Sequence, residues 1–325
     1  MSSSLANSGC DPSTYPEETD KDIEKIIEKM EECVDSLEVA KWGCQALTEF
    51  TRVNEIKMKS TIRLRLCKII VKAMEKYMDD VEVSIYGCNA LSSIAFGADG
   101  LLAFIKTDAL KVIIKAMNIH NNNFFVARTG MRAFAKITII PRGRQMVIDE
   151  GAVTIIVNAM RKYKSDDKLI EYGCSAIANM ANNEAGKNAA IDAKAPSAIV
   201  KGMTEHIENE ILVFKACIAL RNIARDFPAG REAIVKAKAP KIIIEAMKIH
   251  VDDNDIIIKA CEVLNIINQD SGINYNDKLF GRRCLRYTQR QIHARNNITA
   301  RNNSNTSPTP NYRTGGNRTL KRRKR

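Results

Sequence analysis

The sequence predicts an all-α solenoid of about six repeats, each of three helices. The first observation is a methionine that closes an apolar helical stretch every 43 or 44 residues, at Met30, Met74, Met117, Met160, Met203 and Met247. The second is a small–apolar cluster whose second residue lies fourteen residues after each of these, at Cys44, Cys88, Met131, Cys174, Cys217 and Cys261. Because both spacings hold in all six copies, the body of the chain is a repeat array.

The fourth copy illustrates the elements of one repeat. Residues 152–163 place apolar side chains at helical spacing, and a turn of Ser and Asp separates them from a second periodic stretch, residues 168–181. A shorter stretch, residues 144–149, precedes the pair and predicts a short first helix. Each repeat is therefore expected to hold one short and two longer helices.

Glycine and proline mark the starts of these helices. A glycine lies seventeen residues before the repeat methionine in four copies, at Gly100, Gly143, Gly186 and Gly230. Pro196 and Pro240 share the first turn of the expected middle helix, where the missing N–H has little cost. These positions predict helix boundaries and close packing, and GADG, PRGR and PAGR lack the spacing of a phosphate-binding loop.

The period, helix order and small–apolar–x–Ala–Leu core of the third helix resemble the armadillo repeat, over about residues 21–270. A HEAT-like assignment of some repeats stays open. The resemblance implies a right-handed superhelix whose third helices line a concave groove that binds extended peptides or partner proteins. One such repeat cannot cover its own apolar faces, so stability is expected from stacking.

Composition and charge divide the chain further. Residues 1–20 and 294–325 are polar and predict a disordered N-terminal arm and a disordered basic tail. A capping helix that extends the repeat domain to about residue 293 is the alternative to an end at residue 270. From residue 271 onward the net charge is +13, against +12 for the whole chain, which leaves −1 for residues 1–270. Any charge-based argument for nucleic acid therefore applies to the tail alone.

No enzyme, cofactor or metal is expected. The cysteine register accepts Met131, as a core hydrophobe would and a ligand or nucleophile would not, and no CxxC pair exists. His120, His206 and His250 share one register with Tyr77 and Tyr163, which indicates a polar-tipped side chain at a helix end. Acid pairs such as Asp79–Asp80 and Asp252–Asp253 read as helix caps. The nine cysteines are expected to be reduced thiols in an intracellular chain.

The expected groove supplies the candidate binding residues. Import adaptors of the armadillo family carry a Trp and Asn ladder on their third helices, but here no Trp ladder exists and only Asn179 and Asn222 keep the Asn. Arg128, Arg132 and Lys136, spaced four residues apart, form a basic stripe on one helix face. The full candidate set is Arg128, Arg132, Lys136, Asn179, Arg221 and Asn222. The stripe favours an acidic or phosphorylated partner, or else pairs with acids of neighbouring repeats.

The tail ends in a basic cluster, and three interpretations of the tail are open. Lys321, Arg322, Arg323, Lys324 and Arg325 resemble a nuclear-localisation signal. The tail could also bind nucleic acid phosphates or anionic lipid, or have no specific partner. No transmembrane run or signal peptide is evident, so a cytoplasmic or nuclear location is expected. The sequence thus predicts a non-enzymatic scaffold that binds a protein or peptide, with a nuclear or nucleic-acid adaptor acting through its tail as the alternative.

Overall fold

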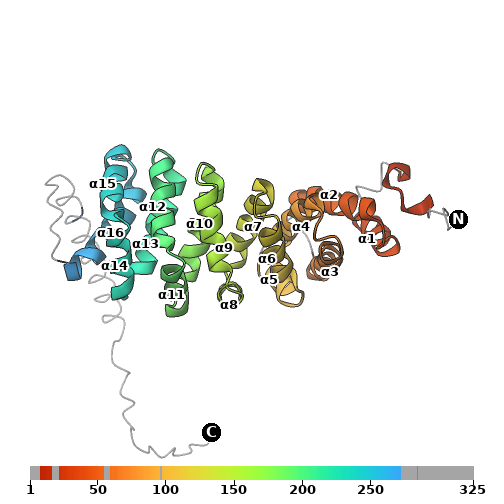
Figure 1. Ribbon diagram of the computed structural model, residues 1–325, viewed down its shortest axis with the longest axis horizontal. Helices are drawn as coiled ribbons and strands as arrows, with labels where there is room; N and C mark the ends of the chain where they lie inside the picture. The colour runs from red at the N-terminus through yellow and green to blue at the C-terminus, as the bar shows by residue number, and fades with distance from the viewer. Residues whose placement is uncertain (1–7, 17–21, 55–58, 96, 272–283, 285–325) are drawn as a thin grey trace, which may run out of the picture. The chain divides into compact units, whose positions relative to one another are not determined.

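The computed structural model describes residues 8–16, 22–54, 59–95, 97–271 and 284. Contacts divide the chain into two units, residues 1–274 and 275–325, and every element described below belongs to the first. Within the described ranges two 3₁₀ turns, η1 (Ser8–Cys10) and η2 (Pro12–Thr14), precede sixteen α-helices, and no strand occurs there. The prediction of an all-α solenoid is confirmed (Figure 1).

The first two repeats contain two helices each. Repeat 1 is α1 (Ile23–Glu32) and α2 (Leu37–Asn54), and repeat 2 is α3 (Ser60–Lys76) and α4 (Val81–Ile94). The prediction of three helices in every repeat is therefore wrong for these two, within the ranges that the structure describes. Repeat 2 has Lys57 where later repeats have the boundary glycine, and α3 runs as one helix through Met74.

The last four repeats contain three helices each. Their bounds are α5 (Gly97–Ile105), α6 (Ala109–Ile119), α7 (Phe124–Ile137), α8 (Pro141–Asp149), α9 (Ala152–Lys162), α10 (Asp167–Met180), α11 (Glu184–Asp192), α12 (Ala195–Glu205), α13 (Glu210–Ala224), α14 (Pro228–Lys236), α15 (Ala239–Ile249) and α16 (Asn254–Ser271). A Cβ added at Gly143 would lie 2.1 Å from the carbonyl oxygen of Ile137, at the end of the preceding third helix. Only glycine permits this approach.

The repeat methionine and the small residue thirteen positions later pack against each other. A Cβ on Gly43 would lie 2.4 Å from Sδ of Met30, and one on Gly87 would lie 2.5 Å from Sδ of Met74. The absence of a side chain at these glycines therefore makes room for the methionine side chain of the same repeat. The register that follows them is fully buried at Cys44, Cys88, Met131, Cys174, Cys217 and Cys261, which confirms the prediction of core cysteines.

Helix starts follow the predicted signals. The side chain of Asp80 accepts hydrogen bonds from the backbone N–H groups of Glu82 and Val83, and Asp253 accepts from Asp255 and Ile256. Asp22 caps α1 in the same way, by accepting from the N–H of Glu24. These acids are helix caps, as their position in the turns indicated.

Residues 8–16 differ from the expected disordered arm. Residues 8–10 and 12–14 form the two 3₁₀ turns, and Cys10 forms a disulfide with Cys33 at the end of α1. The expectation that every cysteine is a reduced thiol is therefore wrong for these two residues, and it is also wrong for Cys261 and Cys284, which are disulfide-bonded. The remaining residues of the expected arm, and the expected tail, lie outside the described residues.

Candidate functional site: the third-helix surface

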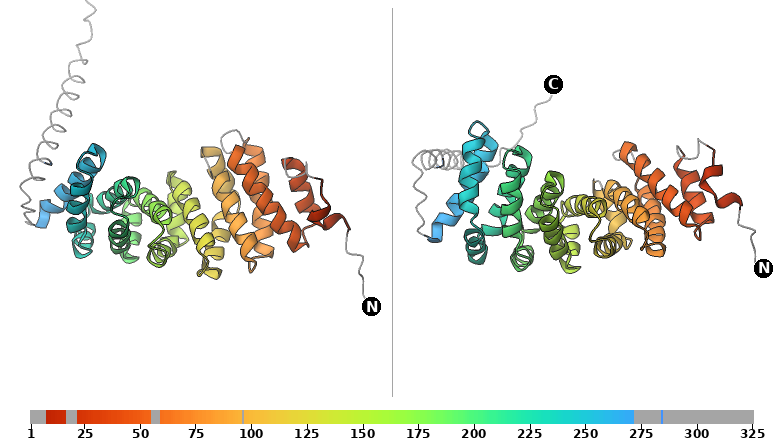
Figure 2. Two further views of the ribbon diagram at one scale, coloured as in Figure 1. Left: turned by 90° about the horizontal axis from the view of Figure 1, so that it is seen from above. Right: turned by 45° about the horizontal axis from the view of Figure 1, so that its top comes forward.

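The candidate site is the partly exposed side of the last helix of each repeat, which corresponds to the third helix of the expected three. These helices are α2, α4, α7, α10, α13 and α16, and each contacts the next (Figures 1 and 2). Helical periodicity turns positions two before and two after the buried small residue toward the same side. We call this side the third-helix surface. It includes residues at these positions, among them Lys41, Arg128, Arg132, Glu171, Phe214, Ile218 and Glu262, together with the adjoining exposed or half-buried residues Trp42, Lys136, Lys168, Ile211, Lys215, Arg221 and Lys259.

The predicted basic stripe lies on α7, but its arginines are engaged with neighbouring repeats. Nε of Arg128 lies 3.8 Å from Oδ1 of Asp166. Arg132 donates through Nε to Oγ of Ser92 at 2.7 Å, and its Nη2 donates to the backbone oxygen of Asn89 at 3.1 Å. Lys136 is half-buried on the same helix. The stripe therefore joins repeat 3 to repeats 2 and 4.

The predicted asparagines also bond within the scaffold. Nδ2 of Asn179 donates to Oγ1 of Thr138 at 3.2 Å, and Nδ2 of the buried Asn222 donates to the carbonyl oxygen of Ala178 at 2.8 Å. Each thus reaches back one repeat. An amide fixed in this way supports helix stacking, and the neighbouring third helices hold it in place.

Two carboxylates, of Glu171 and Glu262, form ion pairs with basic side chains of the third-helix surface on the last three repeats. Glu171 accepts from Lys215 at 2.6 Å and from Lys168 at 2.9 Å. Arg221 donates to Glu262 at 2.7 Å, and Lys259 lies 3.1 Å from the same carboxylate. Burial alone raises the pKa of Glu171, but the two lysine hydrogen bonds outweigh it, so this pKa lies below its ordinary value. Glu262 behaves in the same way.

An apolar stripe on α13 was missed by the sequence reasoning. Ile211 is 53% exposed, and Phe214 and Ile218 are half-buried. Their spacing of three and then four residues places them on one helix face. The signal was present in the sequence, because the other five repeats have a polar or charged residue, such as Ser175 or Arg132, at the register where α13 has Ile218. It went unused because apolar residues on a repeat helix are normally assigned to the core.

The turns between second and third helices form another inter-repeat contact, away from this surface. In repeats 2 to 6 the side chain three residues after the methionine donates to a backbone carbonyl of the preceding repeat. The pairs are Tyr77 to Val34, His120 to Met78, Tyr163 to Asn121, His206 to Lys164 and His250 to Ile207, at 2.7–3.2 Å. We call these five bonds the turn ladder. They confirm the prediction of polar-tipped side chains at helix ends.

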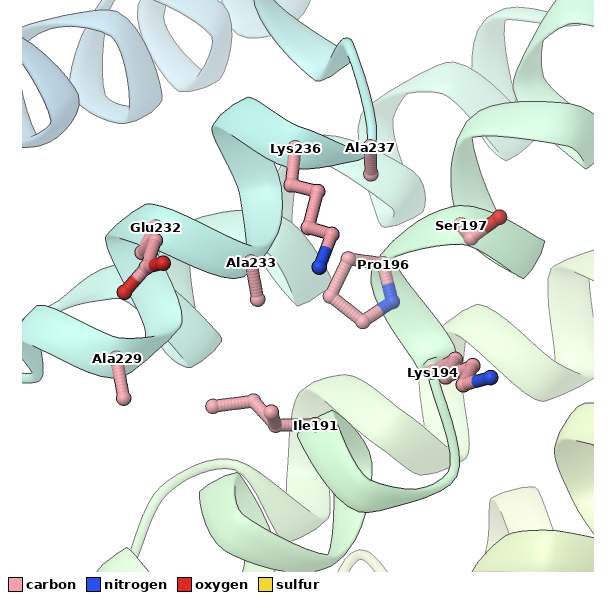
Figure 3. Close-up of a pocket in the computed structure, with 9 residues that line it drawn as sticks. All are labelled: Ile191, Lys194, Pro196, Ser197, Ala229, Glu232, Ala233, Lys236 and Ala237. Carbon is pink, nitrogen blue, oxygen red and sulfur yellow. The ribbon is translucent and has the colours of Figure 1, made fainter.

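A pocket of about 560 Å³ lies on other elements, between α11, the start of α12 and α14. Apolar side chains of Ile191, Pro196 and Ala233 form its walls, and Lys194 and Lys236 stand at its rim, with Lys236 reaching toward Pro196 (Figure 3). None of the residues predicted for binding lines this pocket, so it is separate from the third-helix surface.

The buried free cysteines are unsuited to nucleophilic chemistry. Burial raises the pKa of the Cys44, Cys174 and Cys217 thiols to about 12, far from the low pKa of a reactive cysteine. Among the residues that the structure describes, no cluster of three or more His, Cys, Asp or Glu side chains could hold a metal ion. No described helix is long and apolar enough to cross a membrane.

Comparison with known proteins identifies the class. Residues 103–279, more than half of the chain, match the family described as LRRK2 ARM repeat. The chain belongs to this armadillo-repeat family.

Solved structures agree on the fold. A designed armadillo repeat protein is 20% identical with a TM-score of 0.60, covering 76% of this chain and 100% of that one. Another, solved in complex with the peptide (KR)4, is 21% identical with a TM-score of 0.59 and the same coverage. An engineered protein reaches a TM-score of 0.62 at 20% identity, covering 76% of this chain and 96% of its own. No curated protein matches. The predicted terminal cluster, Lys321–Arg325, lies outside the described residues.

Proposed function

We propose that this protein is a non-enzymatic scaffold that binds an extended peptide or a partner protein on its third-helix surface. The single observation that carries the proposal is the apolar stripe of Ile211, Phe214 and Ile218. Isoleucine exposed beside half-buried apolar neighbours adds nothing to the core, whereas it offers area to a partner. The designed neighbour that binds a peptide supports this use of the fold.

Charge around the stripe suggests the partner's chemistry. From α7 to α16 the basic members of the surface are Arg128, Arg132, Lys136, Lys168, Lys215, Arg221 and Lys259, against Glu171 and Glu262. A partner segment that combines apolar side chains with carboxylate or phosphate groups complements such a surface. We therefore propose an acidic or phosphorylated amphipathic segment.

The test is a selection of peptides from a random library on the full chain, followed by affinity measurement with variants. Ile211→Ser is expected to weaken the selected peptide at least tenfold, because the peptide loses apolar contact. Ile119→Ser is the matched control, since Ile119 is 44% exposed on the second helix α6 and is expected to change affinity less than twofold. Equal losses in both variants, or none in either, would refute this site. Arg132 is a poorer target, because its replacement also removes bonds between α4 and α7.

A second role for the tail remains a proposal from the sequence. Its charge of +13 supports contact with nucleic acid phosphates or nuclear targeting. Truncation after residue 270 is expected to remove salt-sensitive binding of RNA or DNA while leaving peptide binding on the third-helix surface intact. Retained RNA binding in the truncated chain would exclude the tail as its source.

A further inference from the structure

The first repeat departs from the turn ladder in an informative way. In repeats 2 to 6 the register three residues after the methionine holds Tyr or His, which bonds to the repeat before it. In repeat 1 this register holds Cys33. Cys33 is instead bonded covalently to Cys10. Residues 8–16 thus attach where the preceding repeat would attach, and we call them the cap segment.

Few other bonds hold the cap segment. Oγ of Ser36 donates to the carbonyl oxygen of Cys10 at 3.4 Å, a long hydrogen bond. The ring of Tyr15 meets Trp42 edge-on at a centroid distance of 4.9 Å, and Nζ of Lys29 lies 5.7 Å from the Tyr15 ring. These contacts are individually modest and depend on the segment staying near α1 and α2. The disulfide provides that proximity.

We infer that Cys10 and Cys33 form a reversible thiol–disulfide site that fastens the cap segment over Trp42 when oxidised and releases it when reduced. The reductant is a dithiol and the oxidant a small-molecule disulfide. In reduction a thiolate of the dithiol attacks Sγ of Cys10, and the electron pair of the breaking S–S bond leaves on Sγ of Cys33, which then takes a proton. The second thiol of the reductant displaces Cys10 as a thiolate, so two electrons pass to the protein and the reductant becomes a disulfide.

Access decides which sulfur is attacked. Cys10 is half-buried, whereas Cys33 is buried, with 5% of its surface exposed. The described free thiols, Cys44, Cys67, Cys88, Cys174 and Cys217, are all buried, and burial raises the pKa of each far above its ordinary value. They supply almost no thiolate at neutral pH, so they do not compete for the exchange.

Release of the cap segment would change the exposure of residues at one end of the third-helix surface. Trp42 is a half-buried member of that surface on α2, and Tyr15 covers its ring in the oxidised protein. Reduction would uncover the indole and extend the exposed apolar area of repeat 1. The role of this area in partner binding rests on the proposed function, but the covalent site and the release do not.

Trp42 is the only tryptophan in the chain, so tryptophan fluorescence reports on the surroundings of this one side chain, which Tyr15 of the cap segment contacts. The full protein is incubated with glutathione disulfide, alkylated, digested and analysed by mass spectrometry, which is expected to find the peptides of Cys10 and Cys33 linked. Acrylamide quenching of Trp42 is then measured before and after dithiothreitol. We expect the quenching constant of the wild type to rise at least twofold on reduction.

Two variants isolate the cause. Cys10→Ser is expected to show the high quenching constant in both conditions, which excludes effects of dithiothreitol on other cysteines. Tyr15→Ala keeps the disulfide and is expected to raise quenching without any reduction, because the covering ring is gone. The inference is overturned if Cys10 and Cys33 are alkylated separately after oxidation, or if quenching in the wild type is unchanged while the disulfide is shown to be reduced. Neither outcome depends on whether Ile211→Ser affects peptide binding.

Discussion

The turn ladder and the third-helix surface both join neighbouring repeats, yet they tolerate exchange of residues very differently. The hydrogen bonds of the turn ladder are accepted by backbone carbonyl oxygens, so either Tyr or His can act as the donor. The ion pairs of the third-helix surface depend on particular side chains, such as Lys215 and Glu171, and one register holds Arg128 in repeat 3 but Glu171 in repeat 4. A contact to the backbone repeats with the fold, whereas a contact to a side chain belongs to one pair of repeats.

The largest effect is expected where a side-chain pair is broken. Lys215→Ala leaves the carboxylate of Glu171, which is 8% exposed, with only Lys168, and we expect a loss of about 2 kcal/mol in the free energy of unfolding. Lys164→Ala is the control, because its ion pair with Glu205 is exposed to solvent and is expected to contribute far less to the free energy of unfolding. Denaturant unfolding of both variants measures the difference. Equal losses of unfolding free energy in the two variants would mean that the buried ion pair of Glu171 is no more important for stability than an exposed one.

Acid should weaken the same surface before it weakens the turn ladder. The pKa values of Glu171 and Glu262 are lowered on folding, so their contribution is complete above the ordinary glutamate pKa of 4.5 and is lost as the pH falls through the folded values. The hydrogen-exchange protection factors of α10, α13 and α16, which are corrected for the intrinsic exchange rate at each pH, are expected to decrease as the pH falls below about 4.5. In Glu171→Gln this pH dependence should flatten at the α10–α13 contact. An unchanged profile in the variant would remove Glu171 as its source.

The smallest effect is expected for exchange within the turn ladder. Tyr163→Phe removes the hydroxyl that donates to Asn121 and is expected to cost about 1 kcal/mol. Tyr163→His restores a donor of the kind that repeats 3, 5 and 6 use, and its loss should be smaller than that of Tyr163→Phe. Thermal unfolding of the two variants ranks them. If His is the worse substitute, the register is not interchangeable and the contrast with the third-helix surface fails.

Much of the fold could be predicted because its causes repeat along the chain. The methionine and cysteine registers, the capping aspartates and the boundary glycines each recur at one spacing, and the structure places them as predicted. The error in repeats 1 and 2 arose where the pattern itself stops: only four of the six copies have a boundary glycine. A short first helix was nevertheless assigned to all of them.

The site could be predicted less well. The basic residues on α7 lie on one face, as their spacing required, but Arg132 bonds to Ser92, which is forty residues away in sequence. Nothing in a local pattern indicates which acid or hydroxyl will lie opposite a given cation, because that depends on how adjacent repeats stack. The role of the six candidate residues in partner binding therefore stays a prediction.

The sequence by itself determined the class of this protein, its period and its core, because burial of apolar side chains at helical spacing is a local property of the chain. Only the tertiary structure decided which charges neutralise each other, which apolar side chains stay exposed on α13, and that Cys33 meets Cys10. Each of these joins residues that are far apart along the chain or depends on what a neighbouring repeat covers. Such proximity arises only when the repeats stack.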